Sequence, residues 1–85
     1  MYKILLIETG EYLYHRKEYL RLFIYSSFEI ANLNCFTDIF TRNQINEFFY
    51  TNSVIYVDSK HKIEINLKNK ALFDIIEIGE KNHDI

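Results

Sequence analysis

The stretch YKILLIETGEYLYH, from Tyr2 to His15, predicts two antiparallel strands joined by a turn at Thr9 and Gly10. Its run Ile4 to Ile7 holds four aliphatic residues without alternation, so this strand presents hydrocarbon to both faces of a sheet. We therefore expect it to lie in the interior of the sheet, with a neighbouring strand on each side and cover on both faces.

The length of the turn stays open between two alternatives. A two-residue loop places Glu8 opposite Glu11, where like charges repel each other. A three-residue loop with Gly10 in the left-handed conformation avoids this pairing and shifts the register by one residue. The register in turn decides whether Leu13 or Tyr14 faces the core.

Length and composition predict one small soluble domain. The chain has 85 residues, enough to bury roughly 60% of its unfolded surface in one core. A single cysteine excludes an internal disulfide and a multi-thiolate zinc site, and it favours a reducing compartment. Without an apolar run near the ~20 residues of a membrane span, and without a signal peptide, we expect a cytoplasmic protein with no membrane partner.

The charge balance gives no global attraction to nucleic acid. Lys and Arg total 10, Asp and Glu total 12, and the formal net charge is -2. Contact with phosphate therefore requires a local basic patch. Aromatic residues make up 16% of the chain, with seven Tyr and seven Phe, which gives much buried or interfacial area for the length.

Residues 19–25 alternate with period two and predict a third strand. One face carries Leu20, Leu22 and Ile24, and the other carries Tyr19, Arg21, Phe23 and Tyr25. Because helices usually cover one face of a small sheet, the aromatic face is either part of the core or an interface.

Two capping boxes predict two consecutive helices. Ser26 with Glu29 begins the first, whose apolar stripe includes Cys35 and extends to about residue 40. Thr41 with Gln44 begins the second. In that second helix Ile45, Phe48 and Phe49 point inward, and Asn52 ends it in the left-handed conformation.

Three further strands follow, at residues 54–57, 63–67 and 73–78. The whole pattern predicts an α+β fold of order βββααβββ, with an antiparallel sheet of five or six strands and two consecutive helices on one face. Residues 1–79 form the single domain, and residues 80–85 are expected to be a frayed acidic tail.

Three segments resemble the short uncharacterised early proteins of tailed bacteriophages: YKILLIETGEYL at the start, YSSFE at residues 25–29, and FDIIEI at residues 73–78. Many proteins of that group begin with a strand, a Thr-Gly turn and a second strand. The resemblance implies a phage protein that takes over or disarms host machinery by binding it in the host cytoplasm. It carries no functional residue across, because the matching positions are structural.

The amphipathic aromatic residues of the first three strands are the main candidates for binding a partner. Tyrosine around a central arginine is the composition of interface hot spots. The predicted partner is a host protein or protein complex, whose activity the chain inhibits, and an edge strand offers a route to a homodimer. The candidate partner-binding residues are Tyr12, Tyr14, Tyr19, Arg21, Phe23 and Tyr25.

A nucleic-acid-binding module is the alternative. It requires folding to bring two basic groups together, beside tyrosines that stack on bases. One group lies around Arg16, Lys17 and Arg21, and the other consists of Lys60, Lys62, Lys68 and Lys70. Interleaved glutamates favour ordinary solvated faces instead.

No catalytic or metal-binding pattern is present in the sequence, so we expect neither an enzyme nor a cofactor. His15 and His61 lie far apart, lack ligand spacing, and are expected to be solvated. Cys35 is expected to be a small core residue, and its role as a nucleophile would require His15 or His61 folded against it.

Overall fold

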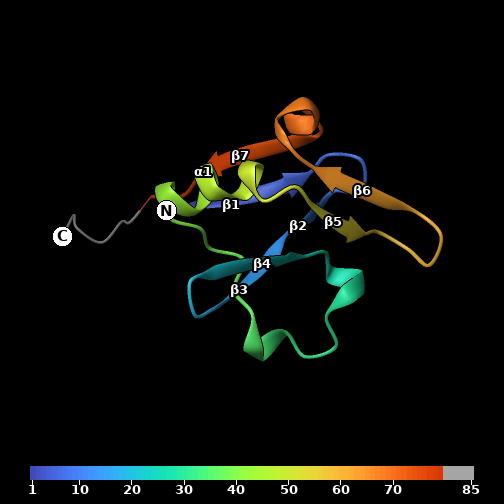
Figure 1. Cartoon of the computed structure of the whole chain (residues 1–85), viewed down its shortest axis with the longest axis horizontal. Coiled ribbons are helices and arrows are strands. Elements are labelled where there is room, and N and C mark those ends of the chain that lie inside the picture. The colour runs from blue at the N-terminus through green and yellow to red at the C-terminus, as the bar shows by residue number, and fades with distance from the viewer. Residues whose placement is uncertain (80–85) are drawn as a thin grey trace.

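Three small antiparallel sheets and one α-helix surround a common core in the computed structural model, which describes residues 1–79 (Figure 1). The first sheet has the order β2-β1-β7 and consists of β1 (Tyr2–Leu6), β2 (Glu11–Tyr12) and β7 (Phe73–Glu77). The other two are the hairpins β3 (Tyr14–Glu18) with β4 (Arg21–Tyr25), and β5 (Ser53–Tyr56) with β6 (Lys62–Ile65). The α+β class is confirmed, whereas the strands form three separate sheets in place of the predicted single one.

Strand β1 is the interior strand that its aliphatic run predicts. It pairs with β2 on one side and with β7 on the other. Ile4 and Leu6 are fully buried and Leu5 is half-buried, so the strand places hydrocarbon on both faces. Ile7 lies beyond the strand and is 56% exposed.

The turn after β1 is longer than either predicted alternative. Leu6 pairs with Glu11, which leaves a four-residue loop from Ile7 to Gly10. Gly10 has a φ of +74°, the left-handed conformation that glycine tolerates best, and its N–H donates to the Leu6 carbonyl at 2.8 Å. With this register Leu13 faces the core.

One bent strand joins the first two sheets. Residues 11–12 belong to the first sheet and residues 14–18 to the second, while the Leu13 N–H still donates to the Ile4 carbonyl at 2.9 Å. On the far side of β3, His15 exchanges backbone hydrogen bonds with Thr37. The two sheets therefore cover one core although neither is wide enough to do so alone.

The first predicted helix is wrong. The Ser26–Glu29 capping box exists, and the Ser26 N–H donates to the Glu29 carboxylate at 3.1 Å, but it opens a single 3-10 turn (η1, Ser27–Glu29). A second 3-10 turn follows (η2, Leu33–Cys35), where the Asn32 side chain accepts from the Asn34 N–H at 3.0 Å. Such local side-chain bonds compete with an α-helix.

The chain between η2 and the helix is extended and pairs with strands. Phe40 exchanges backbone hydrogen bonds with Tyr2 at 2.8 and 2.9 Å, as Thr37 does with His15. Backbone groups that the predicted helix would have used internally thus bond to β1 and β3.

The second predicted helix is confirmed as α1 (Arg42–Tyr50). Thr41 accepts from the Gln44 N–H at 3.2 Å, and the Gln44 side chain accepts from the Thr41 N–H at 2.9 Å. Phe48 and Phe49 are buried, and Asn52 has a φ of +51°, as expected of the residue that ends the helix.

Aromatic rings from three parts of the chain form the centre of the core. Phe48 lies 6.0 Å from Phe40 and 5.4 Å from Phe73 between ring centroids, edge to face in both cases. Ile63 and Ile65 of β6 are buried, while Leu67, which the predicted strand of residues 63–67 included, lies in η3 (Leu67–Leu72) and is exposed. The tail predicted at residues 80–85 falls outside the described residues.

Candidate functional site

The β3–β4 hairpin has one face in the core and one face outside. Leu22 and Ile24 of β4 point inward and are buried, together with His15 of β3. On the outer face the register places Tyr14 opposite Tyr25, Arg16 opposite Phe23, and Glu18 opposite Arg21. Phe36, from the extended segment beside β3, joins this outer face, because its ring contacts side chains from both strands.

We call this surface the arginine-aromatic face and define it by Tyr14, Arg16, Arg21, Phe23, Tyr25 and Phe36. The Tyr25 and Phe36 rings meet edge to face with centroids 5.1 Å apart. The Arg16 guanidinium lies 5.4 Å from the Phe36 centroid, and that of Arg21 lies 5.1 Å from the Phe23 centroid. Stacking of this kind holds the planar cations over the rings while their N–H groups still face outward.

Four of the six predicted partner-binding residues lie together on this face. They are Tyr14, Arg21, Phe23 and Tyr25. Tyr19 lies at its end, in the turn between the two strands, where it is 99% exposed. Tyr12 is separate, because it belongs to the first sheet and its ring faces Lys3, whose Nζ is 5.0 Å from the centroid.

Two residues of this region were missed by sequence reasoning. Phe36 was placed inside a helix, and nothing in the local pattern showed that its segment pairs with β3. Leu20 was placed on the inner face of the strand but lies in the turn, 92% exposed. The strand begins at Arg21, two residues later than predicted, which leaves Leu20 in the turn. The alternation of residues 19–25 gives no reason to prefer that start.

The basic residues of the nucleic-acid alternative are spread over three places (Figure 1). Arg16 and Lys17 lie on β3, Lys60 and Lys62 lie at the far end of the β5–β6 hairpin, and Lys68 and Lys70 lie in η3. Arg16 also pairs with Glu18 at 3.0 Å. The two predicted clusters are not brought together.

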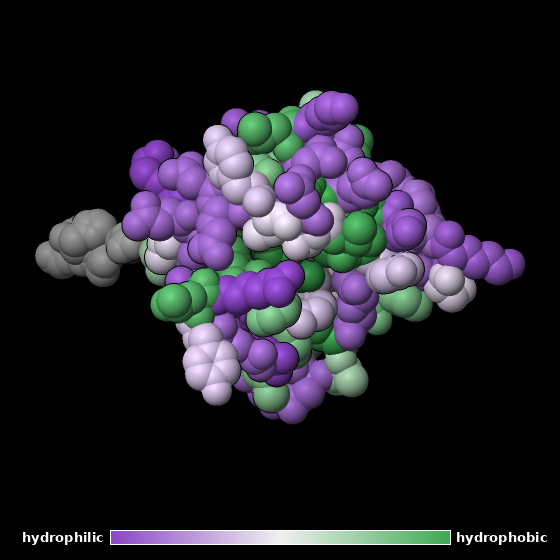
Figure 2. Space-filling model, viewed as in Figure 1, coloured by the Kyte–Doolittle hydropathy of each residue, from purple (hydrophilic) through white to green (hydrophobic). Residues whose placement is uncertain are grey.

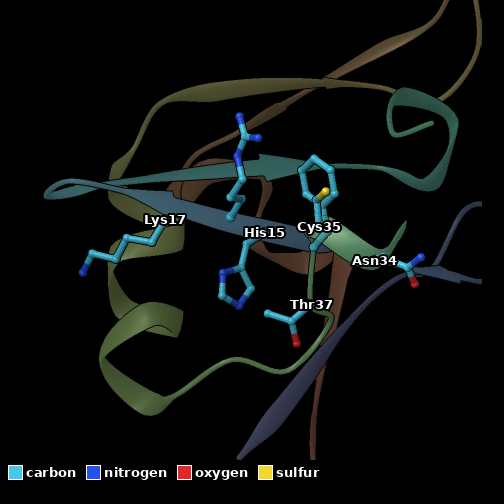
Figure 3. A pocket seen from close by; sticks show the side chains of 7 residues that line it. His15, Lys17, Asn34, Cys35 and Thr37 are labelled. Carbon is cyan, nitrogen blue, oxygen red and sulfur yellow. The ribbon is translucent and has the colours of Figure 1, made fainter. Parts of the chain in front are cut away.

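A surface groove of about 320 Å³ beside β3 contains both His15 and Cys35. The His15 ring turns away from the Cys35 sulfur (Figure 3). It packs on Phe40 with centroids 4.3 Å apart, and its Nε2 lies 2.7 Å from the Ile39 carbonyl oxygen, which makes it the donor to that oxygen.

Both predictions for these two residues are therefore wrong. His15 is buried in the core where solvation was expected, and Cys35 is exposed where a core position was expected. Burial lowers the pKa of His15 below its ordinary value of 6.5, against the opposing effects of the Ile39 carbonyl and the Asp38 charge. The arrangement therefore does not make His15 a base for Cys35.

Within residues 1–79, no group of three or more His, Cys, Asp or Glu side chains is placed to hold a metal ion. No helix in that part of the chain is long and apolar enough to cross a membrane. Comparison with family models, curated proteins and solved structures gives no match. The candidate site among the described residues is the arginine-aromatic face, where four predicted binding residues lie together.

Proposed function

We propose that this chain is a small phage-type protein-binding module that engages a host macromolecular machine or defence factor through the arginine-aromatic face and inhibits it. The observation that carries the proposal is the gathering of four predicted binding residues on the outer side of one hairpin. Aromatic side chains and arginine dominate the energetics of protein interfaces, whereas they are uncommon together on surfaces that only meet water.

The construction of the face supports this role. Phe23 and Tyr25 are half-buried, so their rings are held in place and lose little conformational freedom when a partner covers them. Arg21 is exposed and forms no salt bridge to another described residue, which leaves it free to meet a carboxylate. The proposal assigns no catalytic group to the chain.

Affinity capture from bacterial lysate tests the proposal. The wild type is expected to retain a stoichiometric protein, and Arg21→Glu is expected to lose it because the reversed charge meets the carboxylate that Arg21 would bind. Lys60→Glu is the matched control, since it makes the same charge reversal in the turn of another hairpin. Recovery of no stoichiometric partner from a monomeric wild type would overturn the proposal. Light scattering gives the mass of the wild type in solution and so tests whether it forms a homodimer through an edge strand.

Nucleic-acid binding remains the second proposal. It predicts an affinity that falls steeply with salt and weakens when Lys60, Lys62, Lys68 and Lys70 are neutralised. Absent or salt-independent binding to single-stranded and duplex DNA would remove it. The separation of the basic residues favours the protein-binding role.

A further inference from the structure

The turn between β3 and β4 projects two large apolar side chains into solvent. Tyr19 and Leu20 are its two central residues, and they are 99% and 92% exposed, the highest values among the large hydrophobic residues described. In Figure 2 a green and pale projection stands at the lower left, where Figure 1 places this turn. We call these two residues the hairpin tip.

The backbone of the tip is strained at a residue whose side chain is almost fully exposed. Tyr19 has a φ of +56°, a conformation that is rare for a bulky side chain and that costs about 1–2 kcal/mol relative to the right-handed region. Two-residue hairpin turns with a positive φ at the first central position ordinarily carry glycine there. Stability of the hairpin therefore does not explain tyrosine at this position.

The hairpin also concentrates positive charge on a negative chain. Residues 14–25 contain Arg16, Lys17 and Arg21 against Glu18 alone, a formal charge of +2, while the whole chain carries -2. The remaining residues consequently carry -4. A surface that meets the tip is favoured when it is acidic.

We propose that the hairpin tip is an anchor that inserts Tyr19 and Leu20 into an apolar pocket rimmed by carboxylates on the partner protein. The inference rests on the proposed function and adds the shape and charge of the surface that the partner presents. A protein pocket fits better than a lipid surface because the tip continues into the arginine-aromatic face, and a bilayer would engage the tip alone. It fits better than nucleic acid because the Leu20 side chain has no ring that could stack on a base.

Photo-crosslinking with p-benzoylphenylalanine in bacterial cells tests the contact directly. We expect the probe at Tyr19 to form an adduct with one protein, attached to an apolar segment flanked by Asp or Glu. The same probe at Tyr50, which is 69% exposed on α1, is the matched control and should give no such adduct. Equal adducts at both positions, no adduct at Tyr19, or adducts only to lipid or nucleic acid would overturn the inference.

A double substitution separates binding from folding. Tyr19→Gly with Leu20→Asn removes both apolar side chains and supplies the residues that this kind of turn prefers, so the hairpin should fold at least as well. We expect it to weaken capture of the crosslinked partner by about tenfold or more, as for loss of an interface hot spot. Tyr50→Gly with Leu67→Asn, which also removes an exposed tyrosine and an exposed leucine, should retain capture.

The outcomes distinguish this inference from the proposed function. If Arg21→Glu loses the partner while the double tip variant keeps it, the face binds and the tip does not. If the wild type captures no partner, both proposals fail. If the tip variant and Arg21→Glu both lose the partner while the Tyr50 and Leu67 variant keeps it, both stand.

Discussion

His15 is the residue whose burial has the clearest measurable consequence. Its Nε2 donates to the Ile39 carbonyl, but its Nδ1 is buried without a hydrogen-bond partner in the described structure. The neutral ring is tolerated against Phe40, whereas a protonated ring would place a charge in the core.

The fold should therefore weaken in mild acid. Because the pKa of His15 is lowered in the folded state, the unfolded chain takes up a proton near pH 6.5 that the folded chain resists. The contribution of His15 to stability is complete above that pH and is lost as the pH falls toward the lowered pKa, with a slope of at most about 1.4 kcal/mol per pH unit. Urea unfolding of wild type and His15→Leu between pH 8 and pH 5 measures the difference.

The His15→Leu variant should show a flatter pH dependence and a lower stability at pH 8. The cost at pH 8 should be about 1–3 kcal/mol, because the Ile39 carbonyl loses its donor. Ser59→Ala, at an exposed position in the β5–β6 turn, serves as control and should keep the wild-type slope. Equal slopes in wild type and His15→Leu would contradict the assignment.

Tyr19 should be a position where glycine stabilises. Since the side chain is almost fully exposed, Tyr19→Gly loses no packing and relieves the positive φ, which should raise the free energy of unfolding by about 1 kcal/mol. Leu20→Gly is the comparison, because Leu20 has no positive φ and should gain nothing. Urea midpoints measure both, and a destabilised Tyr19→Gly would show that the tyrosine supports the fold after all.

At the scale of the elements, a hydrogen bond from the Ser26 side chain joins the end of β4 to the end of β5. Ser26 is 3% exposed, and its hydroxyl donates to the Tyr56 carbonyl at the end of β5. This bond holds the residue before η1 against a strand thirty residues away in the sequence.

Removing that hydroxyl should loosen the β5–β6 hairpin. Ser26→Ala leaves the Tyr56 carbonyl without its partner, at a cost of about 1–3 kcal/mol. Ser59→Ala, at an exposed position in the turn of the same hairpin, should cost nothing measurable. Hydrogen exchange should show faster exchange of the β5 amides in the first variant alone.

The two capping boxes show what sequence reasoning could and could not reach at this scale. Thr41 and Gln44 satisfy one another and precede a run with an apolar stripe, so helix α1 was predicted with its inward residues. The same pattern at Ser26 failed because the residues after it bond locally, and because Thr37 and Phe40 pair with strands far away in the sequence. Pairing with strands that are distant in the sequence produces no periodic pattern in the neighbouring residues, so it cannot be predicted from them.

At the scale of the whole molecule, the interior strand and most of the arginine-aromatic face were predictable, while the division into three sheets was not. Alternation along residues 21–25 placed Arg21, Phe23 and Tyr25 on one side irrespective of the sheet they joined. The break between the first two sheets at Leu13 depends on how one strand bends over the core. Phe36 reaches the arginine-aromatic face because its neighbour Thr37 pairs with His15 of β3.

The common core predicts that the three sheets unfold together. Phe48 is fully buried against Phe40, Phe49 and Phe73, so Phe48→Ala should lower the free energy of unfolding by about 3–5 kcal/mol. That is a large part of the roughly 5–15 kcal/mol expected of a small domain. Circular dichroism and tyrosine fluorescence should report one coincident unfolding transition. Tyr50→Ala, on the exposed side of α1, is the control and should keep nearly the wild-type unfolding midpoint.

The pairing of β1 with β7 has a consequence for synthesis of the chain on the ribosome. Tyr2 pairs with Glu77, so β1 needs a strand that is translated about seventy residues later. Until β7 leaves the exit tunnel, Ile4 and Leu6 lack their final neighbour, and the nascent chain depends on chaperones or on speed to avoid aggregation. The first sheet can therefore be completed only after β7 has left the exit tunnel, however early β1 emerges.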